Sequence, residues 1–253
     1  MKQLRLLKNK LRLIYGASLL YWMMFLQVSF LVLYLYAYKI TAVSGYFILL
    51  KKDLFLWFIC IPVMVVQHKV SIFSTYYSCI SRVCCKRRMV LVDYMTLAVS
   101  TCISTCIVLS VPLVFLAIKG AALASQEELS AFFFLLMRYI LLGVLMQSII
   151  YSILFAFPDF QKKGGSICVL PFLLYFVFTS PMELLRIKGQ YMLFLDFSAG
   201  AYSGFAMDGA VLWRDIFFYN IHLVGYLVLY IGITVGCLSK RWEFMENETV
   251  CAL

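Results

Sequence analysis

Histidine is the side chain that most often transfers protons in enzymes at neutral pH, so the two histidines are the first candidates for catalysis. They are His68 and His222, and neither belongs to an H-E-x-x-H zinc motif. Each lies within or next to an apolar stretch of the sequence. A histidine in such a stretch usually forms hydrogen bonds between packed helices, and we expect this role for His222 rather than catalysis.

An intramembrane hydrolase is an alternative interpretation of His222. Phe218 and His222 have the spacing of one motif of the intramembrane CAAX-type proteases. Those enzymes also need a double glutamate that is followed four residues later by arginine, whereas Glu127-Glu128 is followed by Leu-Ser-Ala-Phe. Residues that this activity requires are therefore absent from the sequence, and a hydrolase is the weakest functional hypothesis.

The nine cysteines do not form a pattern that binds metal. Two of them, Cys84 and Cys85, are adjacent, and no pair has the C-x-x-C spacing of a zinc or redox site. Five others lie inside apolar runs, where cysteine behaves as a small hydrophobic residue: Cys60, Cys102, Cys106, Cys168 and Cys237. We predict neither a metal site nor a framework of disulfides.

A nucleotide-binding motif is also missing. The G-x-x-x-x-G-K-[ST] loop does not occur, and Gly164-Gly165 is followed by Ser166 without a lysine. The chain is expected to bind no cofactor and to have no enzymatic activity of its own. If the function consumes ATP, another protein must hydrolyse it.

The composition is that of a membrane protein. Of 253 residues, 64% are hydrophobic and 13% are charged, whereas a soluble domain is roughly half apolar and a quarter charged. The net charge of +10 could indicate nucleic acid binding, but the basic residues form short clusters beside apolar runs. Such clusters are typical of cytoplasmic loops that face anionic lipid headgroups, and we expect no nucleic acid partner.

The apolar runs predict an all-α, polytopic fold in a single transmembrane domain. A helix needs about 20 apolar residues to cross a bilayer, and the chain is long enough for about six such helices and short loops. The predicted spans cover approximately 15–38, 54–73, 90–118, 131–157, 166–180 and 215–238. The second span is the least regular, because it must continue past His68 and Lys69. Residues 39–53 are expected to form a short outer connection, and the charged segment 181–214 an interfacial or re-entrant one.

Two further features of the layout concern its inner side. Residues 1–14 alternate basic residues with leucines, which predicts an amphipathic helix in the plane of the inner leaflet. Placing both ends of the chain in the cytoplasm puts fourteen Lys and Arg residues inside and seven outside. This bias favours a multi-pass protein of the cell membrane with cytoplasmic termini. Asp93 would lie in the first turn of the third span, where the helix dipole favours a carboxylate.

Arg138 is the strong charge that falls within a predicted span. A buried arginine needs a partner or water, and Glu127, Glu128 and Glu183 are outer-side candidates for an ion pair. Its long side chain could equally reach the outer headgroups. Arg138, Glu183 and His222 are the polar residues that could line a transport path, although a structural role is expected for Arg138.

The order of these elements resembles the membrane subunits of ABC-2-type exporters, in particular small permeases of peptide or bacteriocin transporters. The resemblance covers most of the chain. It includes the basic helix at Lys2 to Leu13, six spans, the basic inner loop with Ile80-Ser81-Arg82, a short inner turn between the fourth and fifth spans, and a partly apolar outer segment. The coupling region of that family often has a Glu and a Pro before the Arg, and this chain has neither between Phe73 and Arg82.

The resemblance implies a transporter subunit that moves a peptide or another amphipathic substrate. Residues 73–90 would be a coupling loop that docks on a separate cytoplasmic ABC ATPase, which would bind ATP and Mg. A second permease copy or a related permease would complete the path. The implied coupling residues are Ser81, Arg82, Lys86, Arg87 and Arg88 in that loop and Asp159, Lys162 and Lys163 in the second inner turn.

Two simpler interpretations stay open. The basic residues at Arg82 and at 86–88 could merely anchor the neighbouring span at the headgroups. The protein could also be a membrane-bound immunity or scaffold protein that sequesters a peptide without transporting it. That function would not depend on an ATPase.

Overall fold

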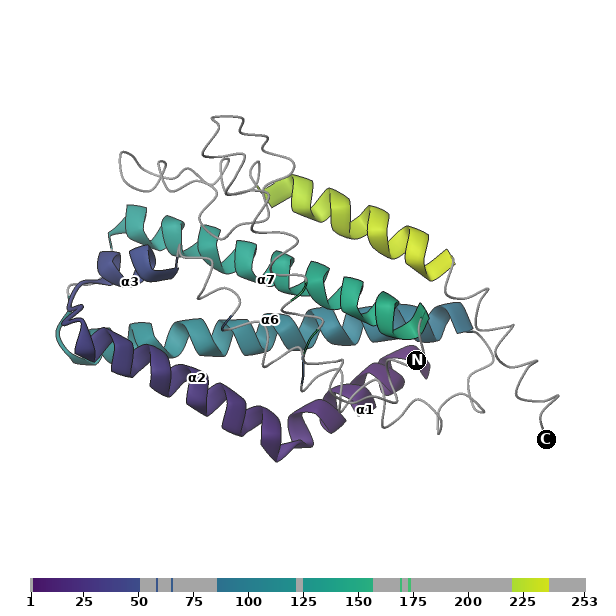
Figure 1. The fold of residues 1–253 in the computed structure, drawn as a ribbon, viewed down its shortest axis with the longest axis horizontal. Helices are drawn as coiled ribbons and strands as arrows, with labels where there is room; N and C mark the ends of the chain where they lie inside the picture. The colour runs from purple at the N-terminus through teal and green to yellow at the C-terminus, as the bar shows by residue number, and fades with distance from the viewer. Residues whose placement is uncertain are drawn as a thin grey trace.

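The computed structural model describes residues 2–50, 58, 65, 86–121, 125–156, 169, 173 and 220–236. The described residues form helices and turns and contain no strand, in agreement with the all-α prediction. The helices are α1 (Lys2–Gly16), α2 (Ser18–Ala37), α3 (Val43–Leu50), α6 (Lys86–Ile118), α7 (Gln126–Ala156) and the C-terminal helix Asn220–Gly236 (Figure 1).

Three of these helices are long and apolar enough to cross a membrane. Their candidate spans are Ser18–Ala37, Val90–Ile118 and Phe132–Ile153, which fall within the predicted first, third and fourth spans. The 33 residues of α6 would reach about 50 Å, well beyond the roughly 30 Å of a hydrocarbon core. Its basic first turn can therefore extend into the headgroups while the rest of the helix spans.

The predicted sixth span contains the apolar helix Asn220–Gly236. The second and fifth predicted spans lie almost entirely outside the described residues. In the second, Phe58 and Val65 are described, and both pack against the core. In the fifth, Val169 and Leu173 are described, and both are exposed.

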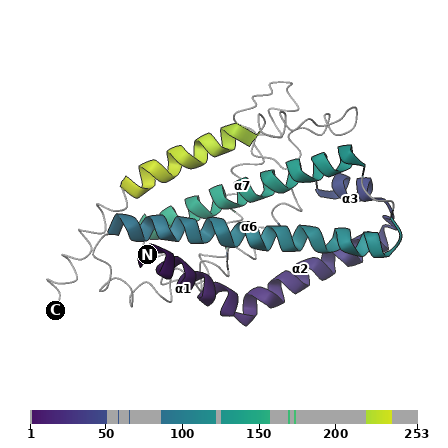
Figure 2. The same ribbon diagram turned by 180° about the vertical axis from the view of Figure 1, so that it is seen from behind.

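Helices α1 and α2 are separated by one extended residue. Ala17 has φ −80° and ψ 112°, so the helical hydrogen bonding stops there and restarts in α2. The break follows Gly16, a residue that weakens a helix interior. A separate helix thus precedes the candidate span Ser18–Ala37, and it ends at Gly16, two residues later than the predicted boundary. The two helices meet at a sharp bend, and the first residues of α1 lie near the beginning of α6 (Figures 1 and 2).

The described helices form one bundle with two distinct ends (Figures 1 and 2). Helices α1, α2 and α6 run in one direction, while α7 and the C-terminal helix run in the opposite one. The end of the bundle that holds the first residues of α1 and α6 also holds the last residues of α7 and of the C-terminal helix. We call it the basic end, because Lys86, Arg87 and Arg88 form the first turn of α6 there.

The connection predicted for residues 39–53 is only partly a surface loop. Val43–Leu50 is a helix, α3, and four of its side chains are buried: Tyr46, Phe47, Leu49 and Leu50. The Tyr46 hydroxyl donates to the carbonyl of Leu109 on α6 at 3.0 Å, and the Tyr139 hydroxyl of α7 donates to the carbonyl of Leu50 at 2.7 Å. The apolar character of this segment decides its position, because most of its residues are better placed in the core than at a polar surface.

Buried hydroxyl groups in the long helices bond to their own backbones. Thr96, Ser100 and Thr101 of α6 each donate to the carbonyl four residues earlier at 2.7 Å, and Ser148 of α7 does the same. A hydroxyl satisfied in this way can lie in apolar surroundings without a partner on another helix. These residues therefore do not by themselves form a polar path through the bundle.

Helices α2 and α6 end in the same kind of cap at the end opposite the basic end. The amide of Ile40 donates to the carbonyl of Leu35 across Lys39, and the amide of Ala121 donates to that of Leu116 across Gly120. The residue before the donating amide has a positive φ in both caps, 51° at Lys39 and 81° at Gly120. Glycine adopts this conformation freely, whereas a residue with a Cβ atom is strained in it.

This difference predicts opposite effects of two substitutions on the free energy of unfolding. Lys39→Gly should raise it by about 1 kcal/mol because the backbone strain is removed, and Gly120→Ala should lower it by about 1 kcal/mol because strain is introduced. A Cβ at Gly120 would meet nothing within 4 Å, so the backbone alone sets that effect. Thermal unfolding of the purified protein in detergent measures both. Two shifts of the same sign would contradict the cap assignment.

Candidate functional site

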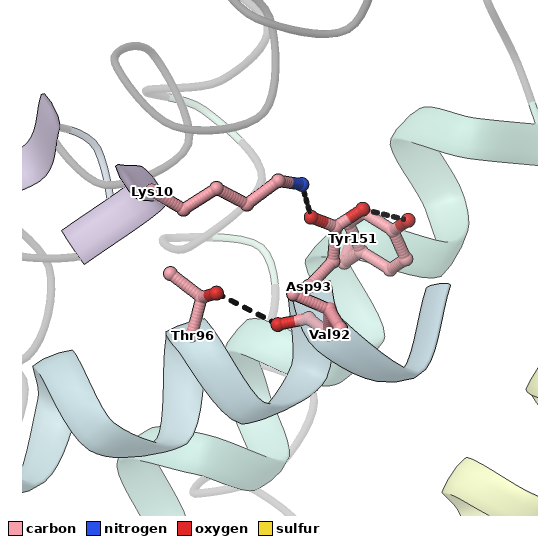
Figure 3. A network of polar contacts seen from close by, with 5 residues as sticks. All are labelled: Lys10, Val92, Asp93, Thr96 and Tyr151. Carbon is pink, nitrogen blue, oxygen red and sulfur yellow. Dashed lines mark hydrogen bonds and ion pairs between the residues drawn. The ribbon is translucent and has the colours of Figure 1, made fainter. Parts of the chain in front are cut away.

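A buried ion pair joins α1 to α6 at the basic end. Lys10 of α1 donates to Asp93 Oδ1 on α6, and the two side chains are 3% and 0% exposed. The Tyr151 hydroxyl of α7 donates to the other carboxylate oxygen, Asp93 Oδ2, at 3.0 Å. Figure 3 shows the three side chains converging from three helices. We call Lys10, Asp93 and Tyr151 the polar clamp.

The position of Asp93 explains why the clamp exists. Because α6 begins at Lys86, Asp93 lies about two turns into the helix rather than in its first turn, and the predicted stabilisation by the helix dipole is wrong. A buried carboxylate without that help needs an opposite charge and hydrogen-bond donors. Lys10 provides the charge, and Tyr151 donates to the second oxygen.

A second set of contacts extends the clamp to the C-terminal helix. The Tyr94 hydroxyl of α6 lies 3.1 Å from Ser152 Oγ of α7 and 2.8 Å from Thr234 Oγ1. The Ser152 and Thr234 hydroxyls both donate to carbonyls of their own helices, so Tyr94 can donate to either oxygen. The rings of Tyr94 and Tyr151 meet edge to face at 5.2 Å. Two adjacent residues of α6 therefore connect it to three other helices.

The contact between α1 and α6 continues along α1 beyond the clamp. The Tyr15 hydroxyl donates to the carbonyl of Ser100 at 3.2 Å. Ile14 is fully buried beside it. Because Lys10 and Tyr15 both contact α6, α1 is held at two points.

The predicted coupling residues fall partly within the described chain. Lys86, Arg87 and Arg88 belong to the first turn of α6. Residues 86–90, which the predicted coupling loop includes, are therefore helical. Asp93 follows them by five to seven residues, about 8 to 10 Å along the helix axis. The other coupling candidates lie outside the described residues, namely Ser81, Arg82, Asp159, Lys162 and Lys163.

Arg138 lies in the interior of the bundle. Its side chain is fully buried on α7, whereas a side chain that extended to the headgroups would be exposed. Two of its predicted partners are also too far away, because Glu127 and Glu128 lie on the same helix about 15 Å earlier along its axis. The third predicted partner, Glu183, lies outside the described residues.

His222 lies near the beginning of the C-terminal helix and is half-buried. Its ring meets Tyr226 edge to face at 6.5 Å, one turn later on the same helix. This contact is a packing interaction. Within the described residues, no group of three or more His, Cys, Asp or Glu side chains could hold a metal ion.

The polar clamp has no recognisable motif in the sequence. Lys10 was one of several basic residues in an amphipathic helix, and its partner is 83 residues away in the sequence. Tyr151 is one of seventeen tyrosines. The feature that could have indicated the clamp is Asp93 itself, since a carboxylate three residues inside the apolar stretch that starts at Val90 requires a cation.

The chain matches no protein-family model, no curated protein and no solved structure.

The clamp predicts strong coupling between substitutions at Lys10 and Asp93. Asp93→Asn should lower the free energy of unfolding by about 3 to 5 kcal/mol, because it leaves the Lys10 ammonium buried without a carboxylate. Adding Lys10→Met should recover part of that loss, since the buried charge is then gone and the amide oxygen introduced at position 93 can still accept the Tyr151 hydrogen bond. Denaturant unfolding of the wild type, the two single variants and the double variant in micelles measures the coupling.

The matched control is Lys8→Met, which removes a lysine from the exposed face of the same helix. It should change the free energy of unfolding by no more than about 0.5 kcal/mol. Strictly additive effects of Lys10→Met and Asp93→Asn, or an equal loss from Lys8→Met, would show that the ion pair does not hold α1.

Proposed function

We propose that the protein is a multi-pass permease subunit of an ATP-driven exporter, which moves a peptide or another amphipathic substrate across the cell membrane. The complete subunit would have six spans. ATP and Mg would be bound by a separate cytoplasmic ATPase, and a second permease copy or a related permease would complete the path. The polar clamp, which lies next to the basic first turn of α6, is the observation that carries this proposal.

The arrangement of helices supports insertion in a membrane with the basic end inside. Three helices are long and apolar enough to span. Of the eleven described Lys and Arg residues, eight belong to α1 or to the first turn of α6, whereas only Lys39 and Lys119 follow the opposite ends of α2 and α6. Cations concentrate on the cytoplasmic side of membrane proteins. Helices α2 and α6, the proposed first and third spans, run in one direction, and α7 and the C-terminal helix, the proposed fourth and sixth, run in the opposite one. These directions fit a chain with both ends inside.

The clamp supports a coupling role because it links the basic end of α6 to several helices. A force on the first turn of α6 would act on a continuous helix, and Asp93 follows within about 10 Å along its axis. There the carboxylate is bonded to α1 and α7, and the adjacent Tyr94 contacts the C-terminal helix. A displacement of α6 would therefore move these helices together. An anchor that only fixed the topology would need no such links.

The proposal predicts that an ATPase docks on the basic residues before and within the start of α6. Charge reversal by Arg82→Glu with Arg87→Glu should lower the ATPase activity that copurifies with the protein by more than about tenfold, because truncating or reversing docking charges costs about 2 kcal/mol or more. The activity is measured on the complex extracted from its native membrane. Total protein and helical content should stay unchanged.

The matched control reverses two lysines at the opposite end, Lys39→Glu with Lys119→Glu. Both side chains are exposed, and the copurified activity should be retained. If no ATPase accompanies the wild-type protein, or if both variants behave alike, the exporter proposal is wrong. If cells that carry the protein stay protected from the peptide when the partner ATPase is inactivated, the immunity or scaffold alternative is favoured.

A further inference from the structure

The two faces of α1 differ in what they do with their basic residues. One face packs on α6, with Lys10 and Ile14 buried and Leu6, Leu7 and Leu11 half-buried. The opposite face exposes three cations, Arg5, Lys8 and Arg12. At about 100° per residue, these three lie within about 60° of one another around the helix axis, and Lys10 points about 160° away from Arg12. We call the exposed set the basic face of α1.

The basic face has an apolar border on each side. Leu4 is 73% exposed and Leu13 is 42% exposed, and they lie on opposite edges of the cationic stripe. Within the described residues, the single ion pair of α1 is the one between Lys10 and Asp93. The stripe is thus a row of cations about 10 Å long with exposed leucines beside it. The cations can bind phosphate headgroups and the exposed leucines can contact acyl chains, so the combination suits a lipid surface.

The depth of α1 also fits a headgroup. Lys10 contacts Asp93, which lies three residues inside the apolar stretch beginning at Val90. The ion pair therefore fixes α1 at the border between the hydrocarbon core and the headgroups of the basic end. Arg5 and Lys8 come earlier in α1 and therefore lie nearer to the headgroups than Lys10 does. The long side chain of Arg12 can extend back to the depth of Lys10.

We propose that the basic face of α1 is a binding surface for anionic phospholipid headgroups, and that the Lys10–Asp93 pair orients it. The pair removes one cation of α1 from the surface and keeps α1 from rotating, so Arg5, Lys8 and Arg12 face the lipid. Basic residues at a membrane surface each strengthen binding to anionic lipid by about fivefold. This inference needs a membrane-inserted chain and does not need an ATPase.

The test compares lipid selectivity of the full-length protein in nanodiscs that contain phosphatidylcholine and phosphatidylglycerol. Spin-labelled lipids of both types report how strongly each associates with the protein. The wild type should favour the anionic lipid, and Lys8→Gln with Arg12→Gln should reduce that preference by about tenfold or more. The preference of the wild type should also weaken at high salt.

Two further variants make the result specific to this face. Lys39→Gln with Lys119→Gln removes the same number of exposed charges from the opposite end, outside the basic face of α1, and should weaken the preference much less. Lys8→Arg with Arg12→Lys keeps both charges and should retain the preference, which separates loss of charge from loss of fold. Equal effects of the two glutamine variants, or no preference in the wild type, would overturn the proposal. If the basic face instead binds a protein partner, the wild type will show no preference for the anionic lipid.

Discussion

Burying a charge in apolar surroundings is costly unless an opposite charge and hydrogen bonds accompany it, and this constraint organises the basic end of the bundle. Asp93 lies where the apolar part of α6 has already begun. Its carboxylate is stabilised there by a cation that approaches from another helix, Lys10 of α1. The approach of Lys10 depends on the bend between α1 and α2, and the break at Ala17 allows that bend. The bend between the first two helices and the clamp are thus parts of one arrangement.

The same constraint relates the fold to the proposed function. The hydrophobic effect that packs the long helices together is non-directional. Asp93 and Tyr94 add directional bonds to three neighbouring helices at one level. Movement of the basic first turn of α6 would therefore be transmitted to those helices. At the opposite end of the bundle, hydrogen bonds from Tyr46 to α6 and from Tyr139 to α3 join the helices, and α2 and α6 end in tight caps at Lys39 and Gly120.

The long apolar helices could be predicted from the sequence, and the polar contacts between them could not. Spans such as Val90–Ile118 follow from hydropathy, which depends only on neighbouring residues. The helix α3 was missed because Val43–Leu50 is too short to cross a bilayer, and its burial depends on contacts with Leu109 and Tyr139. The role of Lys10 was missed because α1 has several basic residues in the sequence, and only packing distinguishes the one that faces α6.

The central claim is that the Lys10–Asp93 pair holds α1 against α6. A distance measurement by pulsed electron resonance tests it directly, with spin labels introduced as unnatural amino acids at the exposed positions Leu13 and Met95 in nanodiscs. A single narrow distance distribution is expected for the wild type, and a broad or longer one for Asp93→Asn. An equally narrow distribution in both proteins would contradict the claim, because α1 would then stay in place without its ion pair.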